Sequence, residues 1–166
     1  MKYKTGMLLL ITLSSVIGYA AVDLNTGVYS GLPDKSMTPG AIDLAVTQEN
    51  LKQTVCITYY TNTVRPPSSY TNKLKKQQIL DYKYKNRDPK LYEEDHLIPL
   101  AVGGNPTSPL NLWPEPRKNT NWGASKKDRL EVLLHKQLCN GKITLEQAQK
   151  AFSDNWIESY KQYIKN

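Results

Sequence analysis

The feature that most constrains the fold of this chain is a pair of strand-like segments joined by a sequence that has to turn. Leu91 to Leu100 has the composition of a strand, and Leu110 to Trp113 is suited to a short returning strand. Gly103-Gly104 and Asn105-Pro106 lie between them and favour a turn. The sequence therefore predicts a β-hairpin with a long loop.

Two helical patterns precede this hairpin. A short helix is expected around residues 47–53, with Thr47 as its cap. A second helix is expected within residues 69–84, capped by Thr71 or Asn72. Its basic face, which is suited equally to phosphate contacts and to simple solvation, contains Lys73, Lys75 and Lys76.

After the hairpin, leucines recur at intervals of three and four residues until Asn140-Gly141, a typical stop signal for a helix. Thr144 and Gln147 are spaced as a capping box, and the apolar stripe that follows them extends to Tyr160 as one last helix. We therefore expect a single α+β domain over residues 47–166, with additional N- and C-terminal helices around a hairpin-plus-helix core.

The first 20 residues have the pattern of a secretory signal peptide. Two lysines precede an apolar run over residues 7–18, and small residues follow in the spacing of a cleavage site. The run is shorter than the ~20 residues that a membrane-spanning helix needs. We therefore expect a periplasmic or secreted protein without stable membrane association, in which residues 21–46 form an irregular arm.

Export would also decide the state of the two cysteines, Cys56 and Cys139, because pairing is the usual fate of thiols in an oxidising compartment. We predict a disulfide between them, with two free buried thiols as the alternative.

The formal net charge is +7, and removal of the first 20 residues leaves +5, with 20 basic and 15 acidic side chains. This balance favours either a polyanionic partner or simple solubility.

Asp95 and His96 lie side by side in the first predicted strand. Imidazole can take a proton from water at neutral pH, and a carboxylate binds hard cations such as Mg²⁺. Neighbours in a strand point to opposite faces, so the two can act on one substrate only if the strand ends or bends there. We expect the second ring nitrogen of His96 to be held by a backbone carbonyl or by an amide side chain across the hairpin, for which Asn111 on the return strand is the candidate.

These residues carry a resemblance to a known family. The segment "EEDHLIPLAVGG", then "NLW" after a proline-bearing loop, then a helix, resembles the HNH endonucleases of the His-Me finger (ββα-metal) superfamily. With "TVRPPSSYTNKLKKQQ", "NLWPEP" and "KKDRLEVLLHKQLCNG", the chain is similar to a group of small exported bacterial HNH-like proteins over most of its length after the signal.

The resemblance implies a ββα-metal fold, Mg²⁺ as cofactor with Mn²⁺ as the alternative, and cleavage of DNA or RNA. It implies that His96 is the general base, Asp95 a metal ligand and Asn111 the residue that orients the base. Asn121 is favoured over Asn119 as the last ligand, although either is also suited to capping the helix, and Asp128 could replace them. The zinc-binding CxxC pairs of many relatives are absent from this sequence.

Other charged residues surround this motif. Glu93 and Glu94 are suited to supporting a metal site or to a charged strand edge. His135 has no acid nearby in the sequence and is expected to be structural or exposed. A basic cluster borders the motif, and we expect it to contact phosphate groups; it consists of Arg117, Lys118, Lys126, Lys127 and Arg129.

The sequence thus predicts an exported, metal-dependent endonuclease of low sequence specificity. One alternative is a non-catalytic cationic protein that binds nucleic acid or the cell envelope. A second alternative is a glycoside hydrolase that uses two of the acids at positions 93–95, which is disfavoured because adjacent acids on a strand diverge. The sequence does not specify an oligomeric state.

Overall fold

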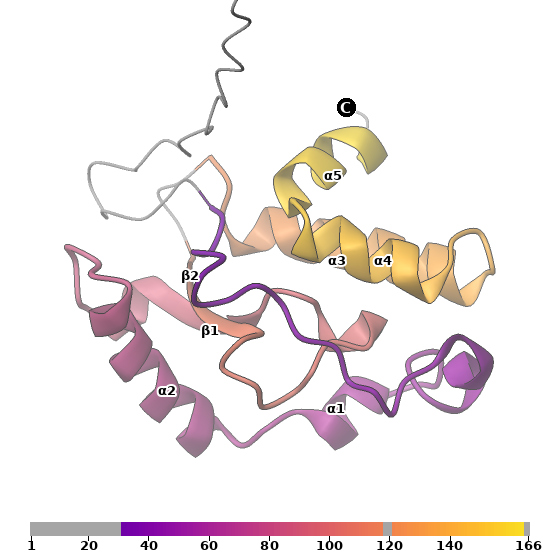
Figure 1. Ribbon diagram of the computed structural model, residues 1–166, viewed down its shortest axis with the longest axis horizontal. Coiled ribbons are helices and arrows are strands. Elements are labelled where there is room, and N and C mark those ends of the chain that lie inside the picture. Colours follow the sequence, from indigo (N-terminus) through magenta and orange to yellow (C-terminus); the bar gives the residue numbers. More distant parts are fainter. Residues whose placement is uncertain (1–30, 118–120, 165–166) are drawn as a thin grey trace, which may run out of the picture.

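The computed structural model describes residues 31–117 and 121–164, so the predicted signal peptide at residues 1–20 lies outside the described residues. The chain combines helices with a two-stranded antiparallel sheet of β1 (Tyr92–His96) and β2 (Leu112–Pro116). The hairpin lies between α2 (Ser68–Asp81) and a group of three later helices (Figure 1). This arrangement agrees with the predicted α+β class.

The first strand is shorter than expected, because β1 ends at His96 and residues 97–111 form the loop to β2. The prediction of a strand up to Leu100 is wrong. Leu97, Ile98 and Val102 are apolar because the loop is buried in the core, with relative exposures of 1%, 3% and 0%. A short apolar run cannot distinguish a strand from a buried loop by its pattern alone.

The helices before the hairpin differ from expectation in two places. The 3-10 helix η1 (Gln48–Gln53) follows Thr47, which forms a capping box with Asn50. The helix α1 (Tyr60–Val64) is a single short helix in a β-branched segment. The helix α2 begins directly after Pro67, so Thr71 and Asn72 lie inside it and are not its caps. Another 3-10 turn, η2 (Pro89–Leu91), leads into β1.

Three helices follow the hairpin, where two were expected. The helix α3 (Ala124–Cys139) ends at Asn140, and the next residue, Gly141, has a φ of 69°. The predicted last helix is two helices, α4 (Leu145–Ser153) and α5 (Trp156–Tyr163). The break occurs because the Asn155 side chain accepts hydrogen bonds from the amides of Ile157 and Glu158, which starts a new helix.

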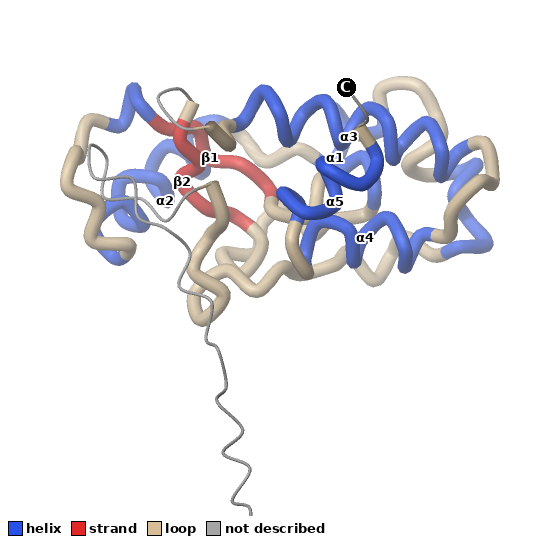
Figure 2. Tube along the Cα trace, turned by 90° about the horizontal axis from the view of Figure 1, so that it is seen from above, coloured by secondary structure: helices blue, strands red, loops and turns tan. Residues whose placement is uncertain are grey.

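Most of the core lies among α3, α4 and α5, and Figure 2 shows these helices extending away from the strands. Leu130 and Leu134 of α3 and Trp156 of α5 belong to this core. Trp113 of β2 and the loop residue Val102 are part of the same cluster. A smaller cluster of Ile79, Tyr84 and Tyr92 packs between α2 and β1. The hairpin is therefore held on one face by α2 and by the larger core on the other.

The predicted disulfide between Cys56 and Cys139 is confirmed, with a Cα–Cα distance of 5.6 Å. It joins the segment after η1 to the last residue of α3. His135, expected to be structural or exposed, lies beside this bridge, and its Nε2 donates to the carbonyl of Val55 at 2.8 Å.

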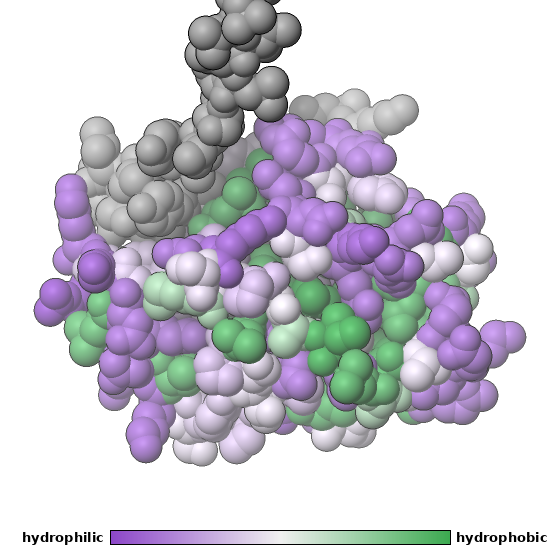
Figure 3. Space-filling view, in the orientation of Figure 1, coloured by the Kyte–Doolittle hydropathy of each residue, from purple (hydrophilic) through white to green (hydrophobic). Residues whose placement is uncertain are grey.

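Figure 3 shows hydrophilic side chains over the edge of the molecule where α2 lies, and hydrophobic ones toward the middle of the same face. Within residues 31–117 and 121–164, we find no helix with the length and apolar character needed to cross a membrane.

Candidate active site

Three carboxylates meet on one face of the hairpin. Glu93 and Asp95 are two residues apart on β1, so they share a face, and the register places Glu115 of β2 opposite Glu93. One carboxylate oxygen from each of these residues lies within 4.8 Å of the others. The strand pairing therefore gathers three carboxyl groups, one of which is Asp95 of the Asp95-His96 pair.

Lys127 of α3 is fully buried against this cluster, with 0% relative exposure. Its Nζ lies 2.5 Å from Asp95 Oδ2 and donates to the backbone carbonyl of His96 at 2.7 Å. Burial by itself raises the pKa of Asp95, but the ammonium of Lys127 outweighs it and lowers that pKa to about 2. The expectation that Lys127 contacts phosphate is wrong, because the side chain is enclosed and already paired.

The other acids around Asp95 hold their protons more firmly than usual. Burial raises the pKa of Glu115 well above its ordinary value, and burial raises that of Glu131 on α3 to about 7. Burial, and then the charge of Asp95, raise the pKa of Asp128. Glu115, Asp128 and Glu131 are therefore carboxyl groups that would ionise more readily if a cation were close.

This donor set fits the divalent cation that the resemblance implies. Carboxylate oxygens are the preferred ligands of Mg²⁺, and Glu93, Asp95 and Glu115 supply them from two paired strands. Both carboxyl oxygens of Glu115 are buried and accept from no donor among the described residues. Besides burial, a hydrogen bond shared with Asp95 contributes to the raised pKa of Glu115. A buried acceptor without a partner is costly, so a cation or its water ligands would satisfy Glu115.

The His96 ring is oriented by a backbone carbonyl of the loop. Its Nε2 lies 2.9 Å from the Pro106 carbonyl oxygen, and since a carbonyl only accepts, Nε2 carries the proton. In the neutral ring, Nδ1 therefore has the free lone pair. Burial lowers the pKa of His96, which favours this neutral form near pH 7.

Asn111 orients His96 only indirectly. Its Oδ1 accepts from the amide of Ile98 at 2.9 Å, and its Nδ2 donates to the carbonyls of Ile98 and Asn105, both at 3.0 Å. The expected direct bond to the ring is wrong, because Pro106 holds that position. Asn111 fixes the loop that carries Pro106.

Gly104 is required for this loop to close. A Cβ placed on Gly104 would lie 1.7 Å from the carbonyl oxygen of Ile98 and 2.9 Å from Asn111 Nδ2. No side chain can occupy that space, because the Ile98 carbonyl is itself bonded to Asn111. The second glycine of the predicted turn therefore serves close packing of the loop.

The remaining predicted residues are dispersed. Asn119 and Lys118 lie outside the described residues, and Asn121 is exposed in the bend before α3. Lys126 and Arg129 lie over aromatic rings, with Lys126 Nζ 4.4 Å from the Trp122 ring centroid and the Arg129 guanidinium 5.7 Å from that of Tyr160. Arg117 forms an ion pair with Glu93 at 2.8 Å, which places it next to the carboxylate cluster.

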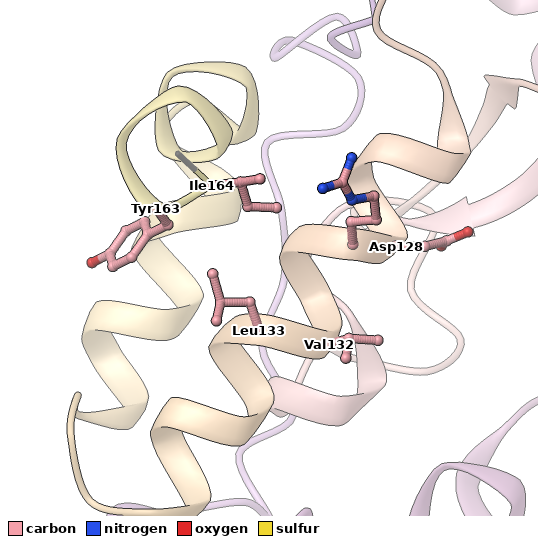
Figure 4. Close-up of a pocket in the computed structure, with 6 residues that line it drawn as sticks. Asp128, Val132, Leu133, Tyr163 and Ile164 are labelled. Atoms are coloured by element: carbon pink, nitrogen blue, oxygen red, sulfur yellow. The ribbon is translucent and has the colours of Figure 1, made fainter. Parts of the chain in front are cut away.

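Two clefts lie near these residues. The larger, about 690 Å³, has a mostly apolar lining between α3 and the end of α5. Figure 4 shows Leu133, Tyr163 and Ile164 on one side of this cleft and Asp128 pointing away from them. The smaller, about 450 Å³, is lined by basic residues of α2 together with Lys90 and Arg117.

Sequence reasoning missed Glu115 and the buried role of Lys127. The signal for Glu115 was available only through the register of the hairpin, which pairs it with Glu93. Lys127 had no such signal, because lysines are seldom fully buried.

Comparisons of this chain with protein-family models, with curated proteins and with solved structures give no match.

Proposed function

We propose that this protein is a metal-dependent endonuclease that hydrolyses phosphodiester bonds in DNA or RNA with low sequence specificity. The observation that carries the proposal is the His96 ring, which is fixed through Nε2 by the Pro106 carbonyl at the end of β1, the strand that also bears Glu93 and Asp95 of the three-carboxyl cluster. A general base and ligands for a hard cation are the two groups that metal-assisted hydrolysis requires.

His96 would accept a proton from water at Nδ1, the nitrogen that the Pro106 bond leaves without a hydrogen. Its lowered pKa keeps the ring neutral, and therefore basic, at neutral pH. Lys127 holds the backbone carbonyl of His96 and so limits movement of the base. These groups position and deprotonate the nucleophile.

Glu93, Asp95 and Glu115 are the residues that would hold the metal, and the resemblance adds Asn121 as a further ligand. When bound there, Mg²⁺ or Mn²⁺ would stabilise the negative charge that develops on the phosphoryl group and on the leaving oxygen.

The test uses purified, disulfide-bonded protein with plasmid DNA and with RNA, in Mg²⁺, Mn²⁺ or EDTA. We expect cleavage with a metal and none in EDTA. We expect His96→Ala to reduce the rate by about 10²- to 10⁴-fold, the usual contribution of a general base.

The matched control is His135→Ala, which removes the second histidine at a distant position near the disulfide. This variant should cleave at the rate of the unchanged protein. Absence of cleavage with every metal, or equal cleavage by His96→Ala, would exclude the assignment.

A second candidate is a non-catalytic cationic protein that binds nucleic acid. The observation that favours it is the Lys127 ammonium, which already neutralises Asp95 without a metal. Binding of DNA or RNA in the same assay, without cleavage under any metal, would select this function.

A further inference from the structure

We propose that the smaller basic cleft binds a phosphate group of the nucleic acid that is several nucleotides away from the bond that is cleaved. The proposal rests on the proposed function and extends it to the way in which substrate is held. The cleft lies between α2 and the beginning of β1, away from His96, which ends that strand.

The lining of this cleft is strongly cationic. Its volume is about 450 Å³, and four basic side chains face it, with Asn72 adding an amide: Lys75, Lys76, Lys90 and Arg117. No acidic residue lines it within the part of the chain that the structure describes. Even with Arg117 paired to Glu93, three lysines around a small open volume favour a polyanion over a neutral ligand.

Two of these cations are held in place by the strand that bears the candidate base. Lys75 Nζ and Arg117 Nε both donate to the backbone carbonyl of Tyr92, at 3.3 Å and 3.2 Å. Arg117 also pairs with Glu93 at 2.8 Å. Less side-chain entropy is lost on binding when donors are already ordered, so these two form the fixed part of the site.

Lys76 and Lys90 form the adaptable part. Both are exposed, and neither forms an ion pair with any residue that the structure describes. They can therefore follow a flexible backbone, as lysines commonly do when they act as point charges for phosphate.

The distance along β1 sets where the bound phosphate lies. His96 lies four positions after Tyr92 along β1, which corresponds to about 13 Å at ~3.3 Å per residue. Successive phosphates of one duplex strand advance by about 3.4 Å along the axis. A duplex whose axis lies along β1 would thus place a phosphate in the cleft about four steps from the bond at His96.

The test is a binding measurement in a protein that lacks the His96 side chain, so that cleavage does not interfere. In a His96→Ala background with EDTA, Lys76→Ala and Lys90→Ala are combined, and affinity for a labelled duplex of 20 base pairs is measured from 50 to 200 mM salt. We expect about tenfold weaker binding at low salt, and a salt slope smaller by about 0.9, the value for one phosphate contact. The control combines Lys136→Ala and Lys142→Ala, which removes the same charge from exposed positions in the last turn of α3 and in the turn that follows it.

If both double variants weaken binding equally, or the cleft variant binds as tightly as its parent, the cleft proposal is overturned. The same pairs of changes are then made with His96 intact, and cleavage of the duplex is compared with that of bis(p-nitrophenyl) phosphate, which is too small to reach the cleft. We expect the cleft variant to be slower on the duplex alone. If binding depends on the cleft but no cleavage occurs, the nuclease proposal is rejected and the cleft proposal stands. If the duplex is cleaved at the same rate by the cleft variant, the cleft proposal is rejected and the nuclease proposal stands.

Discussion

At the level of single residues, the Lys127 ammonium connects the two groups on which the candidate chemistry depends. It lies 2.5 Å from the Asp95 carboxylate and 2.7 Å from the carbonyl oxygen of His96. An ion pair that is enclosed in protein gains stability only while both partners are present. Removal of either charge should therefore be far more costly than the loss of a surface pair.

Lys127→Met keeps the length of the side chain and removes its charge. We expect the free energy of unfolding near pH 7 to fall by about 3–5 kcal/mol, because the Asp95 carboxylate loses its partner. Since the folded pKa of Asp95 is lowered to about 2, its contribution is complete above its ordinary value of 3.8 and is lost as the pH falls through about 2. Urea unfolding between pH 2 and 7 should show this acid-side loss, roughly 2 kcal/mol, in the parent protein only. Parallel curves for the two proteins would contradict the assignment.

The same variant tests the metal site without an activity measurement. In Lys127→Met the three carboxylates lack an internal cation, so Mn²⁺ should raise the melting temperature of the variant more than that of the parent. Lys126→Met, which removes a neighbouring charge that lies over Trp122, is the matched control. An equal response of all three proteins to Mn²⁺ would argue against a metal site at this cluster.

At the level of elements, the loop over residues 97–111 determines the orientation of the base. Leu97 starts the loop with an amide that donates to the carbonyl of Asn111 at 2.7 Å, and the Asn111 side chain binds both sides of the loop. The loop behaves as a rigid unit because its apolar residues are in the core. A change at Asn111 should therefore affect His96 through Pro106.

Asn111→Ala would leave the amide and carbonyl of Ile98 and the carbonyl of Asn105 without this partner. We expect it to lower the free energy of unfolding by about 3 kcal/mol, since each unsatisfied buried group costs about 1–3 kcal/mol and the costs overlap. Cleavage should fall at least tenfold at a temperature where circular dichroism shows a folded protein. Asn62→Ala, at an exposed position of α1, is the control. A folded Asn111→Ala protein with unchanged activity would show that Asn111 does not orient His96 through the loop.

The hairpin shows which elements the sequence predicts and which it does not. Turn residues and Asn111 locate the loop, and capping chemistry locates the starts of η1 and α4. The end of β1 at His96 is not predictable from composition, because Leu97 to Val102 are apolar for tertiary reasons. Glu115 follows only from the register, and the break before α5 depends on the local competition of Asn155 for backbone amides.

At the level of the whole molecule, the disulfide joins segments that are distant in the sequence. Cys56 and Cys139 are 83 residues apart, and the chain between them contains α2, the hairpin and nearly all of α3. A long closed loop restricts the unfolded chain more than a short one does. The bridge should therefore stabilise the entire domain and not only its immediate surroundings.

Replacement of both cysteines by serine should reduce the free energy of unfolding by about 4–5 kcal/mol, the chain-entropy estimate for a loop of this length. Chemical denaturation of the double variant beside the oxidised protein measures the difference. The parent protein after reduction should behave like the variant. A difference below 1 kcal/mol would show that the unfolded chain is already compact around these segments.

The absence of space at Gly104 has a consequence for how this protein tolerates mutation. A methyl group there would collide with the carbonyl of Ile98, so any other residue at this position would prevent the loop from closing as it does here. In a scan of all single substitutions, position 104 should behave as strictly as His96 itself, although it touches no reacting atom. Selection for activity would then preserve a glycine whose only task is to be small.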